Sequence, residues 1–179
     1  MWLTLFERLS KKGYSFGQVS VELADTDVVL ALLAAAGIDR AEVRSAARAH
    51  DPSGAASLLE NVACDVPLRV SDPAKELSHL VDPTLLVRLV RAKDRVFAPL
   101  SARFPGVSFF IAPLRLEGLG YYAGLRLRLN VTLPDGTEIS LGDGGFTTWT
   151  QRLLGNRRER FLASGIGTEL ACKILRGRT

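Results

Sequence analysis

The hydrophobic pattern changes near residue 104, and this change constrains the fold more than any other feature of the sequence. Before it, apolar residues recur at helical spacing, as in the segments 26–36 and 83–100. After it, apolar and polar residues alternate, as in LRLRLNV at 125–131, which is typical of a strand with one buried face. The sequence therefore predicts an α+β fold. A helical subdomain is expected at about 25–100, and a mainly antiparallel sheet with a closing helix at about 105–179.

Turn and capping residues divide the two halves into elements. Glycines and prolines end most of the apolar runs, and Pro134-Asp135-Gly136 has the composition of a hairpin turn. Asp25 and Thr26 stand ahead of an Ala- and Leu-rich run, where either can cap a helix. We expect strands at 16–24, 107–116, 120–133, 137–145 and 161–167. We expect helices at 2–11, 26–36, 39–50, 53–59, 83–100, 148–154 and 168–178.

Length and composition indicate a single globular domain over residues 1–179. The chain has 179 residues, of which 47% are hydrophobic and 23% charged, so it can bury a substantial core. Its 2 cysteines and 2 histidines show no metal-ligand spacing, so we expect no metal and no cofactor. The opening residues lack the pattern of a signal peptide, and no apolar run approaches the ~18 residues that cross a bilayer. We therefore expect a cytoplasmic protein without a membrane partner.

Three glycine-rich strings follow one another in the second half of the chain. They are EGLGYYAG at 117–124, GDGGFTT at 142–148 and ASGIGTEL at 163–170, and VELADTDVVLALLAAAGI at 21–38 precedes them. In order and spacing, over about residues 15–175, these segments resemble histidyl-tRNA synthetase and its paralogue, the regulatory subunit of ATP phosphoribosyltransferase. The resemblance implies a sheet of the class II aminoacyl-tRNA synthetase type, packed by helices.

Several functional positions of that family carry other residues here. The signature arginine that reaches the substrate carbonyl corresponds to Glu117, and an arginine and a tyrosine after the glycine pair correspond to Phe146 and Thr147. The motif 3 arginine, which neutralises ATP, corresponds to Leu170. We also expect the chain to begin downstream of motifs 1 and 2. Because removal of one preorganised donor costs about 10²–10³ in rate, we do not expect adenylation by this chain alone and assign no catalytic residue.

What the resemblance leaves is a pocket for a small ligand, with two tyrosines and with glycines that allow close backbone approach. Strand alternation predicts Arg115, Glu117 and Tyr121 on one face and Tyr122 on the other. A purely structural alternative is a surface ion pair between Arg115 and Glu117, with one tyrosine in the core and the other exposed. The predicted ligand-binding residues are Glu117, Tyr121, Tyr122, Gly144, Gly145, Thr147, Gly165 and Gly167.

Three functional hypotheses follow. The first is a non-catalytic paralogue of histidyl-tRNA synthetase that acts as a regulatory or ligand-sensing subunit, with ATP phosphoribosyltransferase of histidine biosynthesis as candidate partner and histidine as effector. Its signal would pass to the partner through the helical half. The second is a truncated class II ligase that a second chain completes. The third is binding of tRNA or another RNA through the basic C-terminal stretch, whose affinity would fall steeply with salt.

The net charge of the whole chain is only +4, so a solvated basic surface competes with the RNA hypothesis. The clearest bias lies near the C-terminus, at Arg157, Arg158, Arg160, Lys173, Arg176 and Arg178, against Glu159 and Glu169. We also expect a homo-oligomer, or a hetero-oligomer with an enzyme subunit, because unpaired strand edges and apolar faces tend to find partners.

Overall fold

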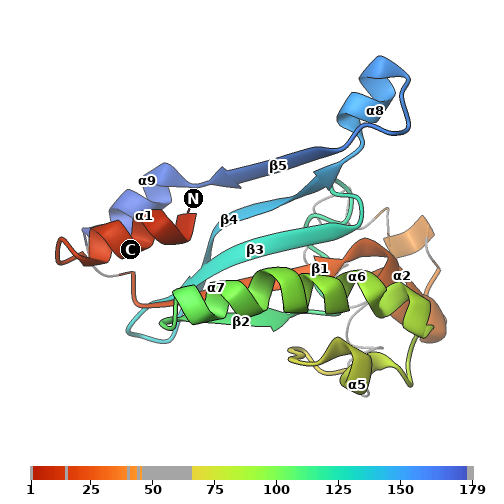
Figure 1. The fold of residues 1–179 in the computed structure, drawn as a ribbon, viewed down its shortest axis with the longest axis horizontal. Helices are drawn as coiled ribbons and strands as arrows, with labels where there is room; N and C mark the ends of the chain where they lie inside the picture. The colour runs from red at the N-terminus through yellow and green to blue at the C-terminus, as the bar shows by residue number, and fades with distance from the viewer. Residues whose placement is uncertain (1, 15, 40, 44, 46–65, 177–179) are drawn as a thin grey trace.

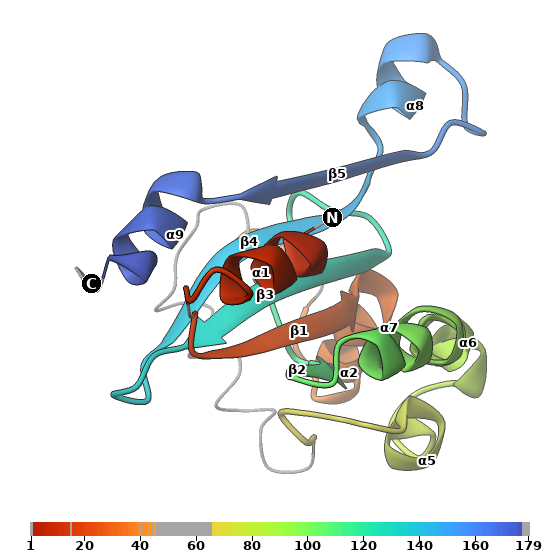
Figure 2. The ribbon, with the colours of Figure 1, turned by 60° about the vertical axis from the view of Figure 1, so that its left-hand side comes forward.

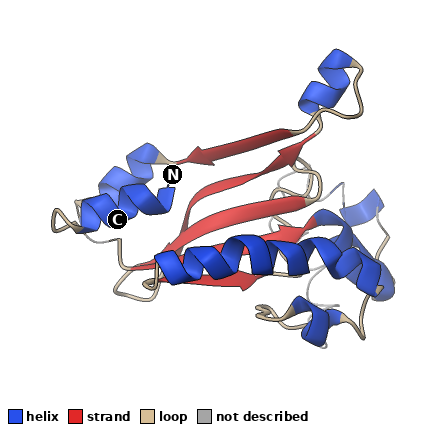
Figure 3. Ribbon diagram, viewed as in Figure 1, coloured by secondary structure: helices blue, strands red, loops and turns tan. Residues whose placement is uncertain are grey.

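The computed structural model describes residues 2–14, 16–39, 41–43, 45 and 66–176. Most of the helix expected at 39–50, and all of the one expected at 53–59, lie outside this part of the chain. At the centre is a five-stranded sheet in the order β2-β1-β3-β4-β5 (Figures 1 and 3). The strands are β1 Gln18–Asp25, β2 Val107–Ile111, β3 Leu125–Thr132, β4 Glu138–Thr147 and β5 Phe161–Ile166.

The sheet is mainly antiparallel, as the sequence predicts. β1 pairs in parallel with β2, whereas the β1–β3, β3–β4 and β4–β5 pairs are antiparallel. Val19, Val21 and Leu23 of β1 lie opposite apolar residues of β3 and face the hydrophobic core. The α+β class and the inward face of the LRLRLNV strand are therefore confirmed.

Helices surround this sheet. They are α1 Trp2–Ser10, α2 Thr26–Ala35, α5 Pro73–Leu77, α6 Pro83–Ala92, η1 Lys93–Phe97, α7 Ala98–Arg103, α8 Trp149–Leu154 and α9 Thr168–Leu175. The α6–η1–α7 helix runs along β1 and β2 (Figures 1 and 2). Helices α1 and α9 lie at the end of the sheet opposite to α2 and α5 (Figure 1). In the described part of the chain, no helix is long and apolar enough to cross a membrane.

The long helix expected at 83–100 is present, and it contains a π-helical turn that the sequence analysis did not predict. In η1 the N–H of Ala98 donates to the carbonyl of Lys93, five residues earlier. Pro99 follows directly and has no N–H to continue a regular ladder. At the start of the other main helix, the Asp25 side chain accepts a 2.9 Å hydrogen bond from the N–H of Asp27 and so caps α2.

The segment 112–124 is a loop, so the strands predicted to include it are wrong in their extent. β2 ends at Ile111, and β3 begins only at Leu125. Pro113 lacks the donor that a ladder needs, and Gly118 and Gly124 adopt φ values of 78° and 74°, which interrupt extended backbone. The alternation argument about which side chains of 115–122 share a face therefore does not apply.

The connection between β4 and β5 carries α8 and projects from the body of the molecule (Figures 1 and 2). We call residues 146–162 the arm. It includes the end of β4, the short helix α8 and the start of β5, which is an outer strand of the sheet. No residue of α8 is buried, whereas β1, β3 and β4 each contain several buried residues.

Candidate functional site

The second face of β1 and β3 carries polar side chains, and Ser20, Glu22, Arg126 and Asn130 among them are buried. Antiparallel pairing places Ser20 opposite Asn130 and Glu22 opposite Arg128. Asn130 is fully buried, and only 1% of Arg126 is exposed. Strand alternation predicts this polar face, and the structure encloses much of it.

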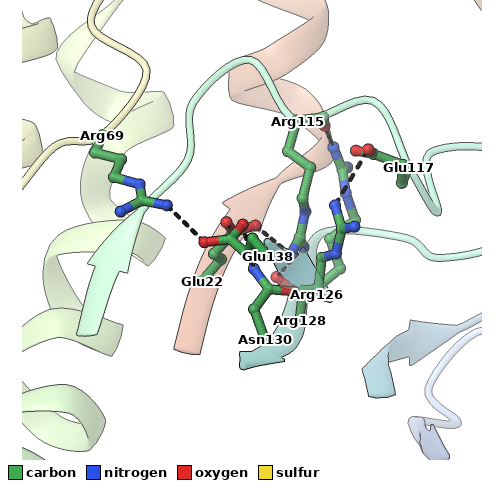
Figure 4. A network of polar contacts seen from close by, with 8 residues as sticks. All are labelled: Glu22, Arg69, Arg115, Glu117, Arg126, Arg128, Asn130 and Glu138. Carbon is green, nitrogen blue, oxygen red and sulfur yellow. Dashed lines mark hydrogen bonds and ion pairs between the residues drawn. The ribbon is translucent and has the colours of Figure 1, made fainter. Parts of the chain in front are cut away.

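Glu22 is at the centre of a polar network on this face (Figure 4). One carboxylate oxygen accepts a 3.0 Å hydrogen bond from the Asn130 amide, and the other lies 3.5 Å from a guanidinium nitrogen of Arg115. The same amide donates to Glu138 at 3.2 Å, and Arg69 donates to Glu138 at 2.9 Å. The buried carboxylate is thus compensated by a cation and an amide, as buried charges require.

Arg115 and Arg126 form a buried pair of guanidinium groups. Arg115 donates to the backbone carbonyl of Arg126 at 2.9 Å, and Arg126 donates to the carbonyl of Arg115 and, at 2.9 Å, to the Thr26 hydroxyl. Desolvation, and then the charge of Arg115, lower the pKa of Arg126 to about 9, so the group stays protonated at neutral pH. Within the described residues, Arg126 forms no ion pair, which leaves positive charge that an anion can neutralise.

A cavity of about 290 Å³, the smaller cavity, opens beside these guanidinium groups. Both signs of charge line it, because Glu117 and Asp143 stand among the three arginines. Its lining consists of Arg115, Glu117, Tyr122, Arg126, Leu127, Arg128, Ser140, Leu141, Gly142 and Asp143.

The ion pairs around this cavity differ from the pair that the sequence analysis considered. Glu117 pairs with Arg128 at 3.2 Å, whereas Arg115 turns to Glu22. The proposed ion pair between Arg115 and Glu117 is therefore wrong, because both residues lie in a loop in which strand alternation has no meaning. Burial lowers the pKa of the Arg115 guanidinium, and the Glu22 carboxylate opposes that change.

The two tyrosines have different environments. Tyr122 is 7% exposed and lines the smaller cavity, whereas Tyr121 is 47% exposed. Their ring centroids are 4.7 Å apart in an edge-to-face contact. Burial, and then the Asp143 carboxylate, raise the pKa of Tyr122 to about 12, which keeps its hydroxyl protonated. The structural alternative was right on this point, since one tyrosine is in the core and the other is at the surface.

The predicted glycines serve different purposes. A Cβ on Gly145 would lie 2.8 Å from the Tyr122 ring, so this glycine is needed where the tyrosine packs. A Cβ on Gly144 would lie 2.8 Å from the Ser164 side chain, which makes Gly144 a requirement of the β4–β5 pair. None of the four predicted glycines, Gly144, Gly145, Gly165 and Gly167, lines the smaller cavity.

A larger cavity, of about 750 Å³, lies on the other side of Tyr122. Tyr121 and the buried Thr147, both predicted site residues, line it. Its outer wall comes from the arm, through Trp149, Arg152 and Arg160. Of the predicted residues, Glu117 lines the smaller cavity, Tyr121 and Thr147 line the larger one, and Tyr122 lines both. The four predicted glycines line neither.

Of the charged residues that line the smaller cavity, the sequence analysis assigned only Glu117 to a ligand site and missed the arginines and Asp143. The alternation in LRLRLNV placed Arg126 and Arg128 on a shared polar face, and this was the available signal. Glu22 and Asn130 carried the same signal, because each occupies a polar position between apolar neighbours. Asp143 stood among glycines, where nothing in the local pattern distinguished it from a turn residue.

Comparison with known proteins places this fold in a class. No family model and no curated protein matches the sequence. Solved structures do match, and the chain has the α+β fold of class II aminoacyl-tRNA synthetases. One similar structure is an ATP phosphoribosyltransferase regulatory subunit/histidyl-tRNA synthetase from Bacillus halodurans C. It has a TM-score of 0.62 and 17% sequence identity, over 97% of this chain and 48% of that chain.

Two further structures have the same fold. A histidyl-tRNA synthetase from Nostoc sp. PCC 7120 has a TM-score of 0.53 and 14% identity, over 98% of this chain and 46% of that chain. A histidine–tRNA ligase subunit from Alicyclobacillus acidocaldarius has a TM-score of 0.51 and 18% identity, over 98% of this chain and 60% of that chain. The chain therefore spans about half the length of these proteins and shares their fold.

Proposed function

We propose that this chain is a non-catalytic relative of histidyl-tRNA synthetase that binds an amino acid and acts as a ligand-sensing or regulatory subunit. The observation that carries the proposal is the smaller cavity, in which guanidinium groups and carboxylates surround a buried tyrosine. A site lined by fixed charges of both signs suits a zwitterion better than a simple anion or an apolar ligand.

An amino acid can satisfy both kinds of charge at this site. Its carboxylate would face Arg115 and Arg126, where the buried positive charge is not fully compensated. Its ammonium group would face Glu117 and Asp143. Histidine is the candidate effector, because its ring would pack on Tyr122, whose hydroxyl oxygen can accept a hydrogen bond from an imidazole N–H while its own proton is shared with Asp143.

Two substitutions relative to the family favour binding without catalysis. Glu117 stands where the resemblance expects the arginine that reaches the substrate carbonyl, and its carboxylate is engaged with Arg128. Leu170 stands where the resemblance expects the arginine that neutralises ATP. A leucine offers no charge to a triphosphate, so amino-acid binding would not lead to adenylation.

The regulatory part of the proposal concerns the protein partner. The name of one structure of the same fold is ATP phosphoribosyltransferase regulatory subunit/histidyl-tRNA synthetase. We therefore take ATP phosphoribosyltransferase as the candidate enzyme partner, in a cytoplasmic hetero-oligomer. Ligand binding would be coupled to the partner through β1, because β1 carries Glu22 on one face and packs on the helical half with the other.

A thermal-shift and calorimetry screen tests the proposal. The purified chain is titrated with histidine, the other amino acids, ATP and phosphoribosyl pyrophosphate. A ligand at about 100 times its Kd adds about 2.7 kcal/mol to the free energy of unfolding and raises the midpoint by a few degrees. We expect a shift with histidine or another amino acid that Arg126→Met abolishes and Arg91→Met, on the exposed side of α6, retains.

Other outcomes contradict the proposal. A shift with ATP together with ATP–pyrophosphate exchange would favour the ligase hypothesis. No shift and no heat with any amino acid would mean that the smaller cavity is not a ligand site.

A further inference from the structure

The arm carries half of the large apolar side chains that the described part of the chain exposes. Of twelve such residues, six belong to the arm and a seventh, Tyr121, lies beside it. Leu153 is 83% exposed and Leu154 is 67% exposed. The seven are Tyr121, Phe146, Trp149, Leu153, Leu154, Phe161 and Leu162.

Folding of the chain does not explain this arrangement. The six residues of α8 include none that is buried, and β5 exposes side chains on both of its faces. Single exposed apolar residues are ordinary, but a contiguous patch of them on a projecting segment marks a surface that binds something. Trp, Tyr and Phe are also the residue types that interfaces concentrate.

The same surface is strongly basic. The arm contains Arg152, Arg157, Arg158 and Arg160, and its one acidic residue, Glu159, accepts a 3.2 Å hydrogen bond from a neighbouring asparagine amide. Within the described residues, none of these four arginines forms an ion pair. Their charge is therefore available to a partner.

The base of the arm provides a place for an anchoring side chain. Tyr121 and Trp149 meet edge to face at 4.9 Å, and Trp149 stacks on Phe161 at 6.4 Å. Tyr121 and Trp149 line the larger cavity, to which Arg152 also contributes. An apolar side chain can enter the cavity beside these rings while an acidic neighbour reaches the Arg152 guanidinium group.

From these observations we propose that the arm is a docking surface for an acidic amphipathic segment of a partner protein. Charge complementarity selects the acidic partner, since a second copy of this chain would present an equally basic arm. The aliphatic side chains of Leu153, Leu154 and Leu162 favour a protein over RNA, for which aromatic and basic groups alone suffice. The inference goes beyond the proposed function, because docking here needs no ligand in the smaller cavity.

A peptide selection followed by binding measurements tests this inference. A library of random displayed peptides is selected on the full chain, and the enriched peptide is synthesised with a fluorescent label for anisotropy titrations. We expect enriched sequences in which Asp or Glu alternates with Leu, Phe or Trp. We expect the double variants Leu153→Ser/Leu154→Ser and Arg157→Glu/Arg158→Glu each to weaken binding by at least tenfold.

A matched variant and an RNA titration make the result decisive. Arg91→Glu/Arg95→Glu changes the same charge at exposed positions on the α6–η1 helix and should leave the affinity within twofold. Peptides that bind all variants equally, or no enrichment of acidic sequences, would overturn the inference. Salt-sensitive binding of a labelled 12-nucleotide oligouridylate that depends on Arg157 and Arg158 but not on Leu153 would overturn it in favour of RNA. Self-association in sedimentation that the arm variants abolish would overturn it in favour of a second copy.

Discussion

In most proteins charged side chains are exposed and large apolar side chains are buried. The polar face of β1 and β3 departs from the first rule, and the arm departs from the second. The polar face buries charges, with Arg126 1% exposed, and the arm exposes leucines, with Leu153 83% exposed. Each arrangement carries a free-energy cost, one of desolvation and one of apolar hydration. A bound ligand or partner can remove such a cost by neutralising the buried charge or by covering the apolar side chains. The comparison therefore supports the proposal of two separate binding surfaces in one chain.

The two regions also differ in how tightly their neighbours hold them. The polar face is formed by the paired strands β1 and β3. Its hydrogen bonds join β3 to β1 through Asn130 and Glu22, and the 112–124 loop to β3 through Arg115 and the Arg126 carbonyl. The arm has a short helix without a buried residue and lies next to an outer strand. Substitutions in the first region should therefore change stability, and substitutions in the second should change binding alone.

The largest effect is expected from Glu22→Ala. This change leaves the Arg115 guanidinium buried without its carboxylate partner and removes an acceptor of the Asn130 amide. Breaking one side of a buried ion pair costs about 3 kcal/mol, and urea unfolding measures the loss directly.

The double variant Glu22→Ala/Arg115→Met provides the control. Removing both partners should recover most of the lost stability, since no uncompensated charge remains. A loss below about 1 kcal/mol in the single variant would show that the polar face is hydrated, and the contrast with the arm would then be weak.

Arg126→Met is expected to act in the opposite direction. The arginine is buried without an ion-pair partner among the described residues, and burial disfavours its charged form. Replacing such a charge by an apolar side chain of similar length should raise the free energy of unfolding by about 2 kcal/mol while removing the thermal shift with an amino acid. A less stable variant would mean that the hydrogen bonds to Thr26 and to the Arg115 carbonyl outweigh the desolvation.

Gly145→Ala should destabilise the chain by about 1–2 kcal/mol. The added methyl group would lie 2.8 Å from ring atoms of Tyr122, so the ring has to move into the smaller cavity. Gly165→Ala, on the adjacent strand β5, meets no atom within 4 Å and is the matched control. Thermal unfolding of both variants measures the difference, and equal midpoints would contradict the packing described here.

The periodicity of apolar and polar residues predicted the strand at 125–131 and the face toward which each of its side chains points. The alternation at 125–131 placed Leu129 toward the core and Arg126 on the polar face, and both placements hold. The parallel β1–β2 pair was not predictable in the same way, because these strands are separated by some eighty residues and no turn signals their pairing. The loop at 112–124 was missed because its apolar residues imitate a strand, although Pro113 argued against one.

The candidate site was predictable as a neighbourhood but not as a set of contacts. The motif at 117–124 located Tyr122 and Glu117, and both line the smaller cavity. Their partners could not be derived from spacing. Arg115 pairs with Glu22, and Glu117 pairs with Arg128, because of the conformation of the 112–124 loop. That conformation depends on tertiary packing. The arm escaped detection as a separate surface because exposure is a property of the folded chain.

The pH dependence of unfolding tests the environment of Tyr122. Its pKa in the folded chain is raised to about 12, above the ordinary value of 10.0, so the folded state binds the phenolic proton more tightly than the unfolded state. The corresponding stability is fully present below pH 10 and is lost as the pH rises toward 12, at up to about 1.4 kcal/mol per pH unit. Tyr122→Phe should remove this part of the pH dependence, and a parallel decline in both proteins would place the titration elsewhere.

The smallest effect is expected from Leu153→Ser in the arm. This side chain is 83% exposed in a helix that buries none of its residues, so its removal should change the free energy of unfolding by no more than about 0.5 kcal/mol. Leu129→Ser provides the contrast, because that leucine is 1% exposed in the core and its loss should cost several times as much. Urea unfolding compares the two variants under identical conditions. If Leu153→Ser destabilised the isolated chain by more than 1 kcal/mol, the leucine would be stabilising the chain itself, and its exposure would no longer require a partner.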